Sequence, residues 1–194
     1  MEQALDLLRD SGAMLEGHFL LSSGLHSDRY FQCARLLAHP RMAEAALEGV
    51  ARAIRQDVRE NNLAIDAVAG PAMGGIIVAY ELGRQLGLPA FFTERDDSGK
   101  MALRRGFDAR KGQRILLAED VITTGKSYGE CAAALESLGM EIAALACIVD
   151  RRQGGEIPWR FYPACRVEVK SWEAAGCDLC EKGVPLVKPG SRKA

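Results

Sequence analysis

A pair of adjacent acids followed by a hydroxyl-rich turn is the part of this sequence whose residue types and spacing best suit the binding of a sugar and a phosphate. Glu119 and Asp120 follow a short apolar run at residues 115–118, which is long enough for a strand buried on both faces. Residues 123–127 form a small polar turn, and a helical pattern begins directly after it. The start of a helix offers free backbone N–H groups and the positive end of the helix dipole, which suit a phosphate. Because the two acids can accept hydrogen bonds from sugar hydroxyls, the stretch predicts a site for a ribose 5-phosphate.

Two other phosphate-binding motifs do not match this stretch. Gly125-Lys126-Ser127 resembles the end of a P-loop, but that motif needs a glycine five residues before Gly125, where this chain has Asp120. The dinucleotide fingerprint G-x-G-x-x-G fits neither this turn nor the glycine-rich residues 70–75. An ordinary strand-to-helix turn without a ligand remains the alternative.

The acids and the turn resemble the 5-phosphoribosyl 1-diphosphate (PRPP) signature of type I phosphoribosyltransferases. That signature has apolar residues, two acids, two apolar residues and a turn of Thr, Gly and Ser. The resemblance assigns PRPP binding to Glu119, Asp120, Val121, Ile122, Thr123, Thr124, Gly125, Lys126 and Ser127.

Residues 70–75 follow a second buried strand and resemble the pyrophosphate loop of the same family. A lysine is common in that loop, and Gly74 stands in its place. The anion would therefore be held by backbone N–H groups and by charges from elsewhere.

A hairpin is predicted over residues 17–31, where two short β-prone runs flank a turn rich in Ser and Gly. The spacing of Ser23, Gly24, Ser27 and Tyr30 resembles orotate phosphoribosyltransferases, in which this segment belongs to a hood over the base. That family often has Lys before the Ser-Gly pair, and this chain has Ser22. From the residues alone, a surface ribbon without a role is the alternative.

Residues 95–106 form a polar, glycine-punctuated stretch that we expect to be a mobile loop. In orotate phosphoribosyltransferases this position is a flexible catalytic loop, and Arg95 and Lys100 match its pattern. The usual Lys-x-His-Gly ending is absent, and Arg104 and Arg105 are candidates to replace its charge. The alternative is a solvated charged loop.

Arg151 and Arg152 come at the end of another buried strand. An arginine at the carboxyl end of a central strand lies near the crevice where open α/β sheets bind ligands, and its planar group suits a carboxylate. The family has an Asp-Arg pair here, with the Arg contacting orotate. We therefore assign Arg151 to orotate and expect Arg152 to be a solvated charge.

The resemblance implies an orotate phosphoribosyltransferase reaction, in which PRPP and orotate give orotidine 5'-monophosphate and pyrophosphate in pyrimidine biosynthesis. Lys100 and Asp120 would be the catalytic residues. Arg95 and Lys100 would meet the pyrophosphate, assisted by Mg²⁺ carried on PRPP, and Thr123 and Arg151 would contact orotate. Family members are typically homodimers that exchange loop residues, which raises the question of whether Lys100 acts on the partner's site. A purine or uracil phosphoribosyltransferase and a non-catalytic PRPP-sensing regulator are the alternatives.

Length and composition predict one domain over the 194 residues, since 48% hydrophobic residues supply a core and 26% charged residues supply a polar surface. The resemblance implies that this is a phosphoribosyltransferase domain. Strands alternating with helices over residues 66–150 predict an α/β fold with a mostly parallel central sheet and helices on both faces. Residues 1–35 would contribute the small hood.

The net charge of -1 gives no general attraction to nucleic acid or membranes. The N-terminus lacks a signal peptide pattern, and a cytoplasmic location is expected.

The cysteines and histidines predict no protein-bound metal. Cys177 and Cys180 form one Cys-x-x-Cys pair, Cys165 is a distant third cysteine, and no second pair or nearby His completes a zinc site. Packing is therefore favoured over a metal for this pair, and the role of Cys177 and Cys180 stays open. The three histidines, His18, His26 and His39, show no metal-ligand spacing and are expected to be structural or exposed. The basic end at residues 188–193 is expected to be a solvated terminus.

Overall fold

The computed structural model describes residues 2–21 and 23–189, so Ser22 and most of the basic end lie outside the described residues. Its helices are α1 (Glu2–Asp10), α2 (Ala34–Leu37), α3 (Pro40–Glu60), α4 (Gly74–Leu86), α5 (Lys126–Glu136) and α6 (Asp178–Glu181). Within these described ranges, no helix combines the length and the apolar composition that crossing a membrane requires.

A six-stranded sheet with the order β5-β4-β3-β6-β7-β8 forms the centre of the molecule. Its strands are β3 (Ala67–Pro71), β4 (Ala90–Arg95), β5 (Met101–Leu103), β6 (Arg114–Ile122), β7 (Glu141–Asp150) and β8 (Arg160–Arg166). All neighbouring strands are parallel except β4 and β5, which confirms the predicted mostly parallel sheet. The sheet extends past the predicted limit of residue 150, because β8 adds an edge strand. Pro163 weakens the strand signal of β8, and a proline is tolerated at an edge.

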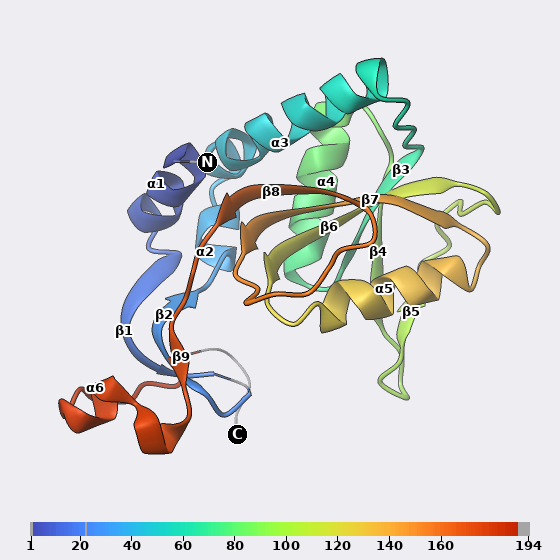
Figure 1. Cartoon of the computed structure of the whole chain (residues 1–194). Helices are drawn as coiled ribbons and strands as arrows, with labels where there is room; N and C mark the ends of the chain where they lie inside the picture. Colours follow the sequence, from blue (N-terminus) through green and yellow to red (C-terminus); the bar gives the residue numbers. More distant parts are fainter. Residues whose placement is uncertain (1, 22, 190–194) are drawn as a thin grey trace.

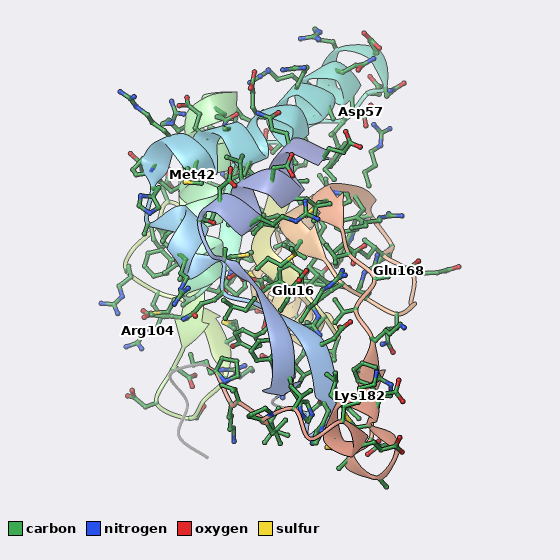
Figure 2. The ribbon with its side chains drawn as sticks, turned by 90° about the vertical axis from the view of Figure 1, so that its left-hand side faces the viewer. Glu16, Met42, Asp57, Arg104, Glu168 and Lys182 are labelled. Carbon is green, nitrogen blue, oxygen red and sulfur yellow. The ribbon has the colours of Figure 1, made fainter. Side chains whose placement is uncertain are left out.

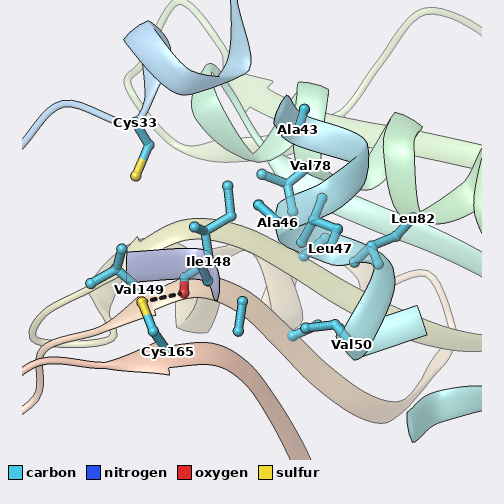
Figure 3. Packing of buried hydrophobic residues seen from close by; sticks show 14 of the residues in the cluster. Cys33, Ala43, Ala46, Leu47, Val50, Val78, Leu82, Ile148, Val149 and Cys165 are labelled. Carbon is cyan, nitrogen blue, oxygen red and sulfur yellow. Dashed lines mark hydrogen bonds between the residues drawn. The ribbon is translucent and has the colours of Figure 1, made fainter. Parts of the chain in front are cut away.

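Helices cover both faces of this sheet, as predicted (Figure 1). On one face, α3 and α4 pack over β3, β6, β7 and β8, and α1 lies beside α3. Figure 3 shows this core, in which Ala43, Leu47 and Val50 of α3 meet Val78 of α4 and Ile148 of β7. The spacing of the apolar residues along α3 matches one helical face, and Pro40 suits the first turn. The opposite face is covered by α5, whose Cys131 and Leu135 pack on Leu117 and Leu145.

The hood is a separate three-stranded sheet with the order β1-β2-β9. Strands β1 (Met14–Leu20) and β2 (His26–Phe31) form the predicted antiparallel hairpin, with an irregularity between Glu16 and Phe19. The third strand, β9 (Ser171–Trp172), comes from the other end of the chain, followed by a turn of 3₁₀-helix η1 (Ala174–Gly176) and by α6. The hood therefore needs the C-terminal segment as well as residues 1–35 (Figure 1).

Part of the stretch predicted as a loop at residues 95–106 is a β-hairpin. Strand β5 pairs antiparallel with β4, with Arg95 opposite Met101 and Thr93 opposite Leu103. The apolar residues Met101 and Leu103 explain the difference, because both pack toward the interior of the molecule. The turn between the strands is held by Asp96, whose Oδ1 accepts hydrogen bonds from the backbone N–H groups of Ser98 (2.9 Å) and Lys100 (3.0 Å).

Candidate active site

The predicted acids lie at the carboxyl end of β6, between β3 and β7 in the middle of the sheet. The backbone N–H of Arg151, directly after β7, donates to the carbonyl oxygen of Ile122 at 3.0 Å. This bond sets Arg151 beside the end of the acidic stretch. The structure therefore brings these two sequence-predicted features to the same edge of the sheet, where parallel α/β sheets bind ligands.

Glu119 is a buried acid. Burial, together with the neighbouring charge of Asp120, raises the pKa of its carboxyl from 4.5 to about 9. Its Oε1 accepts a hydrogen bond from the backbone N–H of Asp120 at 3.1 Å. At neutral pH the free protein thus holds Glu119 protonated, so its hydroxyl can donate a hydrogen bond as well as accept one.

Asp120 is half-buried and lies against the second glycine-rich motif. Its Oδ1 accepts a hydrogen bond from the backbone N–H of Val121 at 2.9 Å. A Cβ atom built on Gly74 would lie 2.3 Å from Oδ2 of Asp120, so the carboxylate occupies the space that a side chain would fill. The acids and residues 70–75, separated in sequence, therefore form one continuous site.

Gly70 and Gly75 explain how the glycine-rich loop comes so close to β6. A Cβ atom on Gly70 would lie 2.2 Å from the carbonyl oxygen of Gly75 and 2.7 Å from that of Ala118. A Cβ atom on Gly75 would lie 2.7 Å from Cδ of Pro71. Glycine is therefore required at both positions for α4 to begin beside the end of β6.

The hydroxyl-rich turn forms the start of α5, as predicted. Gly125 is the N-cap residue with a φ of 82°, a left-handed conformation that glycine adopts readily. A Cβ atom there would lie 2.7 Å from the hydroxyl of Tyr128, whose ring covers the turn. Thr123 and Thr124 are exposed, as are Lys126 and Ser127 in the first turn of the helix. The turn is thus accessible and carries the helix-terminus N–H groups that bind anions.

Arg95 is held by an acid of α5 that the sequence did not single out. Its Nη2 lies 2.5 Å from Oε2 of Glu130, and its Nη1 donates to the carbonyl oxygen of Gly99 at 2.6 Å. Nζ of Lys126 lies 4.0 Å from Oε1 of the same Glu130. Glu130 therefore links the β4–β5 hairpin to the first turns of α5.

Lys100 lies in the exposed turn of the hairpin, and within residues 2–21 and 23–189 its ammonium group forms no ion pair. The two arginines proposed to replace the missing charge are directed elsewhere. Nε of Arg105 donates to Oε1 of Glu94 at 2.6 Å, and Nε of Arg104 lies 4.0 Å from the same atom. In this conformation Arg104 and Arg105 brace the base of the hairpin.

Arg151 is half-buried next to the hood, within electrostatic reach of Tyr30 and Asp28 of β2. Burial lowers the pKa of its guanidinium, and the interactions with Tyr30 and Asp28 oppose that shift. Oδ1 of Asp28 is buried and has no hydrogen-bond partner among the described residues. A partly desolvated cation facing the hood is what recognition of an acidic base requires.

The expectation that Arg152 is a solvated charge is wrong. Its side chain is only 13% exposed, and it makes two hydrogen bonds with Asp150, Nε to Oδ1 at 2.9 Å and Nη2 to Oδ2 at 3.1 Å. Its Cζ lies 5.1 Å from the ring centre of Phe161. Alternation along an extended chain explains the difference, because residues two apart point the same way and Arg152 folds onto Asp150.

A cavity of about 600 Å³ opens between the hood and the sheet. Asp28, Arg29, Arg152 and Trp172 are among its lining residues, whereas Glu119, Asp120 and residues 123–127 are not. The cavity is thus adjacent to the base side of the site and separate from the acids and the phosphate turn. The acids and the turn remain the candidate site, because the exposed N–H groups at the start of α5 suit an anion.

Three comparisons place this geometry among known proteins. The Phosphoribosyl transferase domain family matches residues 35–180. The curated protein "Orotate phosphoribosyltransferase" of Carboxydothermus hydrogenoformans is 49% identical over 189 residues, which covers 96% of each chain. Among solved structures, orotate phosphoribosyltransferase from Aeropyrum pernix has a TM-score of 0.71 at 27% identity, covering 86% of this chain and 94% of that one. Leishmania donovani UMP synthase has a TM-score of 0.67 at 24% identity, covering 86% of this chain and 36% of that one, which is a likeness of fold.

Proposed function

Because the chain belongs to the orotate phosphoribosyltransferase family, we propose that the residues around Glu119 and Asp120 transfer the 5-phosphoribosyl group of PRPP to orotate. The products are orotidine 5'-monophosphate and pyrophosphate, in pyrimidine biosynthesis. One observation carries the assignment of the site: the acids of β6, the glycine-rich loop before α4 and Arg151 after β7 meet at one edge of the sheet. The curated relative supports orotate rather than a purine or uracil base, and a transferase rather than a regulator.

The ribose would lie over the two acids. When the bond between the anomeric carbon and pyrophosphate breaks, positive charge develops on the sugar and negative charge on the leaving group. Asp120, with its accessible carboxylate beside Gly74, is placed to accept hydrogen bonds from the ribose hydroxyls and to stabilise the cationic sugar. Glu119, held neutral by burial, contributes a hydrogen-bonding hydroxyl without a second negative charge.

The 5'-phosphate would lie in the turn at residues 123–127. Backbone N–H groups at the start of α5 and the hydroxyls of Thr123, Thr124 and Ser127 supply donors, and the positive end of the helix dipole favours the anion. Val121, Ile122 and Gly125 contribute to this binding through the backbone. Lys126 adds a mobile positive charge at the rim, since its side chain is exposed.

The pyrophosphate would meet the glycine-rich loop and the hairpin. Arg95 is paired with Glu130, so binding requires that this guanidinium exchange one anionic partner for another. Lys100, in the exposed turn, is free to move with the hairpin onto the leaving group. We propose Lys100 and Asp120 as the catalytic residues, since they would contact the two ends of the bond that breaks.

Mg²⁺ fits this site as a companion of the substrate. Magnesium prefers oxygen ligands and often keeps only one or two protein carboxylates while binding phosphates, and Asp120 is the accessible carboxylate beside the loop. When bound with PRPP, the ion neutralises negative charge on the pyrophosphate. The residues of this chain would hold PRPP on either side of the Mg²⁺ ion.

Orotate would be recognised by its carboxylate. Arg151 offers a planar donor pair, and Thr123 follows β6, whose Ile122 carbonyl accepts the Arg151 backbone N–H. The hood strand β2, with Asp28 and Tyr30, would close the base side. Mixing the protein with Mg²⁺, PRPP and orotate should lower the orotate absorbance, whereas adenine, hypoxanthine and uracil should give little turnover. Preferential use of another base would contradict the assignment to orotate.

A homodimer is the assembly we propose. Met73, Ile77 and Tyr80 lie on one face of α4 and its N-cap, and Met73 and Tyr80 are 82% and 66% exposed. Contiguous exposed apolar side chains are typical of an interface. Ile77→Asp should therefore shift the protein toward monomer in sedimentation velocity. Leu138→Asp, which changes an exposed apolar residue after α5, should leave the assembly unchanged.

Lys100 is the residue that we expect to act on the partner's site. If it does, mixing the impaired variants Lys100→Ala and Asp120→Asn should restore activity, because a mixed dimer contains one intact pair of residues. Recovery should approach about one quarter of parental activity for random exchange, and no recovery after verified exchange would assign Lys100 to its own subunit.

A cytoplasmic location fits six free cysteines, which are typical of a reducing compartment.

A further inference from the structure

Two histidines and two cysteines, which the sequence left unassigned, converge where the C-terminal segment meets the hood. Nε2 of His18 lies 2.9 Å from Nδ1 of His26 and 3.4 Å from Sγ of Cys177. Sγ of Cys180 lies 3.3 Å from Nδ1 of His26 and 3.8 Å from Nε2 of His18. One ligand atom from each of the four residues falls within 4.8 Å of the others. These histidines lack metal-ligand spacing in the sequence, as expected, but the fold brings them together with the two cysteines.

The distances match the edges of a small tetrahedron. Zinc binds imidazole nitrogen at about 2.0–2.1 Å and thiolate sulfur at about 2.3 Å, so nitrogen and sulfur ligands in a tetrahedral site lie about 3.5 Å apart. Three of the four nitrogen–sulfur distances are 3.3, 3.4 and 3.8 Å. The nitrogen–nitrogen distance of 2.9 Å is somewhat shorter than the roughly 3.3 Å of that geometry. A small outward movement of one imidazole would therefore complete the tetrahedron.

The orientation of His18 also suits a ligand. Its Nδ1 lies 2.8 Å from the carbonyl oxygen of Val184, which can only accept, so Nδ1 carries the proton. Nε2 is then left with its lone pair, and this is the nitrogen that faces His26 and the two thiols. A hydrogen bond donated by the non-ligating nitrogen is typical of metal-binding histidines.

Two segments that are far apart in the sequence supply the four residues. His18 and His26 come from β1 and β2, whereas Cys177 precedes α6 and Cys180 lies within it. One helical turn separates the cysteines, which directs both sulfurs to the same side. The chain after α6 runs back along β1, where the N–H groups of Val187 and Leu20 donate to the carbonyl oxygens of His18 and Val187, each at 2.8 Å. Figure 2 shows this segment, near Lys182, beside the ends of the hood strands.

We propose that His18, His26, Cys177 and Cys180 bind one Zn²⁺ ion in a structural site. The donor set of two thiolates and two imidazoles is one that zinc selects, and four protein ligands leave no open position for chemistry. His18, His26 and Cys177 are buried, which suits a closed site. The ion would fix the C-terminal segment to the hood. His26 begins the strand that carries Asp28 and Tyr30, so the same ion would hold the wall of the site that faces Arg151.

The first test is the metal content of the untagged protein. Protein purified without chelator and desalted should contain about one zinc per chain by plasma mass spectrometry. Replacement with Co²⁺ should give the visible absorption of tetrahedral cobalt and a thiolate-to-cobalt band in the near ultraviolet. Absence of metal with no uptake of Zn²⁺ or Co²⁺ under reducing conditions would overturn the proposal. Stoichiometric iron, or a disulfide between Cys177 and Cys180, would overturn it as well.

Variants then assign the ligands. Cys180→Ser and His26→Gln should each lose most of the bound zinc. His39→Gln and Cys131→Ala should keep it, since His39 is the remaining histidine and is exposed, and Cys131 lies in α5. Full zinc content in the Cys180 or His26 variant would refute the assignment. The metal content of the parent protein decides the question even if a ligand variant does not fold.

A stabilising role makes a separate prediction for the parent protein. A strong chelator that removes zinc should lower the Tm by at least about 5 °C, and added Zn²⁺ should restore it. A Tm that does not change after verified zinc removal would refute the structural role.

Discussion

Replacing Arg151 by alanine tests whether this side chain recognises the orotate carboxylate. Its guanidinium is half-buried, and within the described ranges no protein group accepts a hydrogen bond from it. Burial lowers its pKa, which shows that the charge is partly desolvated and not fully compensated by Asp28 and Tyr30. A substrate carboxylate would compensate this charge directly.

The size of the effect follows from the bond that is lost. A hydrogen bond to a charged group contributes roughly 1.5–3 kcal/mol, which corresponds to about 10- to 150-fold in kcat/KM. Because Arg151 is half-buried, the upper half of that range is expected for orotate. Arg151→Lys keeps the charge but loses the planar donor pair, so it should fall between the parent and Arg151→Ala.

The assay is steady-state turnover of orotate, combined with direct measurement of PRPP binding. The Kd for PRPP should change by less than about threefold, since the acids and residues 123–127 carry that binding. The control is Arg52→Ala, because Arg52 lies on α3, is 70% exposed and pairs with Glu48 of the same helix. Arg152 does not serve as a control, since it holds Asp150. If Arg151→Ala left orotate kinetics unchanged, the assignment would be refuted. A collapse of PRPP binding would instead assign Arg151 to the phosphate site.

Three further predictions concern the acids and the hairpin. Asp120→Asn should lower kcat/KM by at least about 10-fold, because one charged hydrogen bond to the ribose is weakened; unchanged kinetics in a folded variant would remove Asp120 from the site. Glu119 has a folded-state pKa of about 9 against an ordinary 4.5, so its contribution to stability is fully present below about pH 4.5 and is lost as the pH rises toward 9. Thermal unfolding of Glu119→Gln should therefore show a stability gain over the parent that grows between pH 5.5 and 8, by at most about 1.4 kcal/mol per pH unit, and a gain independent of pH would contradict the raised pKa. Limited proteolysis should cut residues 95–106 faster without PRPP than with it, and faster still in Glu130→Gln, which weakens the link to Arg95; equal cleavage with and without PRPP would argue against a closing loop.

Local features of the sequence were sufficient for the framework of the molecule. The apolar run before Glu119 predicts a buried strand, and the structure has it as the central strand β6. The apolar residues of α3 recur at helical spacing, and this local pattern is enough to account for the helix at Pro40–Glu60. These predictions succeed because periodicity, chain stiffness and glycine conformations act between residues that are near in sequence. The same reasoning extends to the start of α5, where Gly125 permits the left-handed turn.

Only the tertiary structure decided which distant residues meet. It sets Asp120 against Gly74, pairs Arg95 with Glu130 and turns Arg152 onto Asp150, although Arg151 and Arg152 are neighbours of the same type. It also gathers His18 and His26 with Cys177 and Cys180, which are more than 150 residues away along the chain. Sequence spacing carries no information about such pairs, because the distance between them is set by the packing of the whole sheet and its hood. The sequence therefore determined the elements and the type of chemistry, and packing determined the partners of each charged or metal-binding side chain.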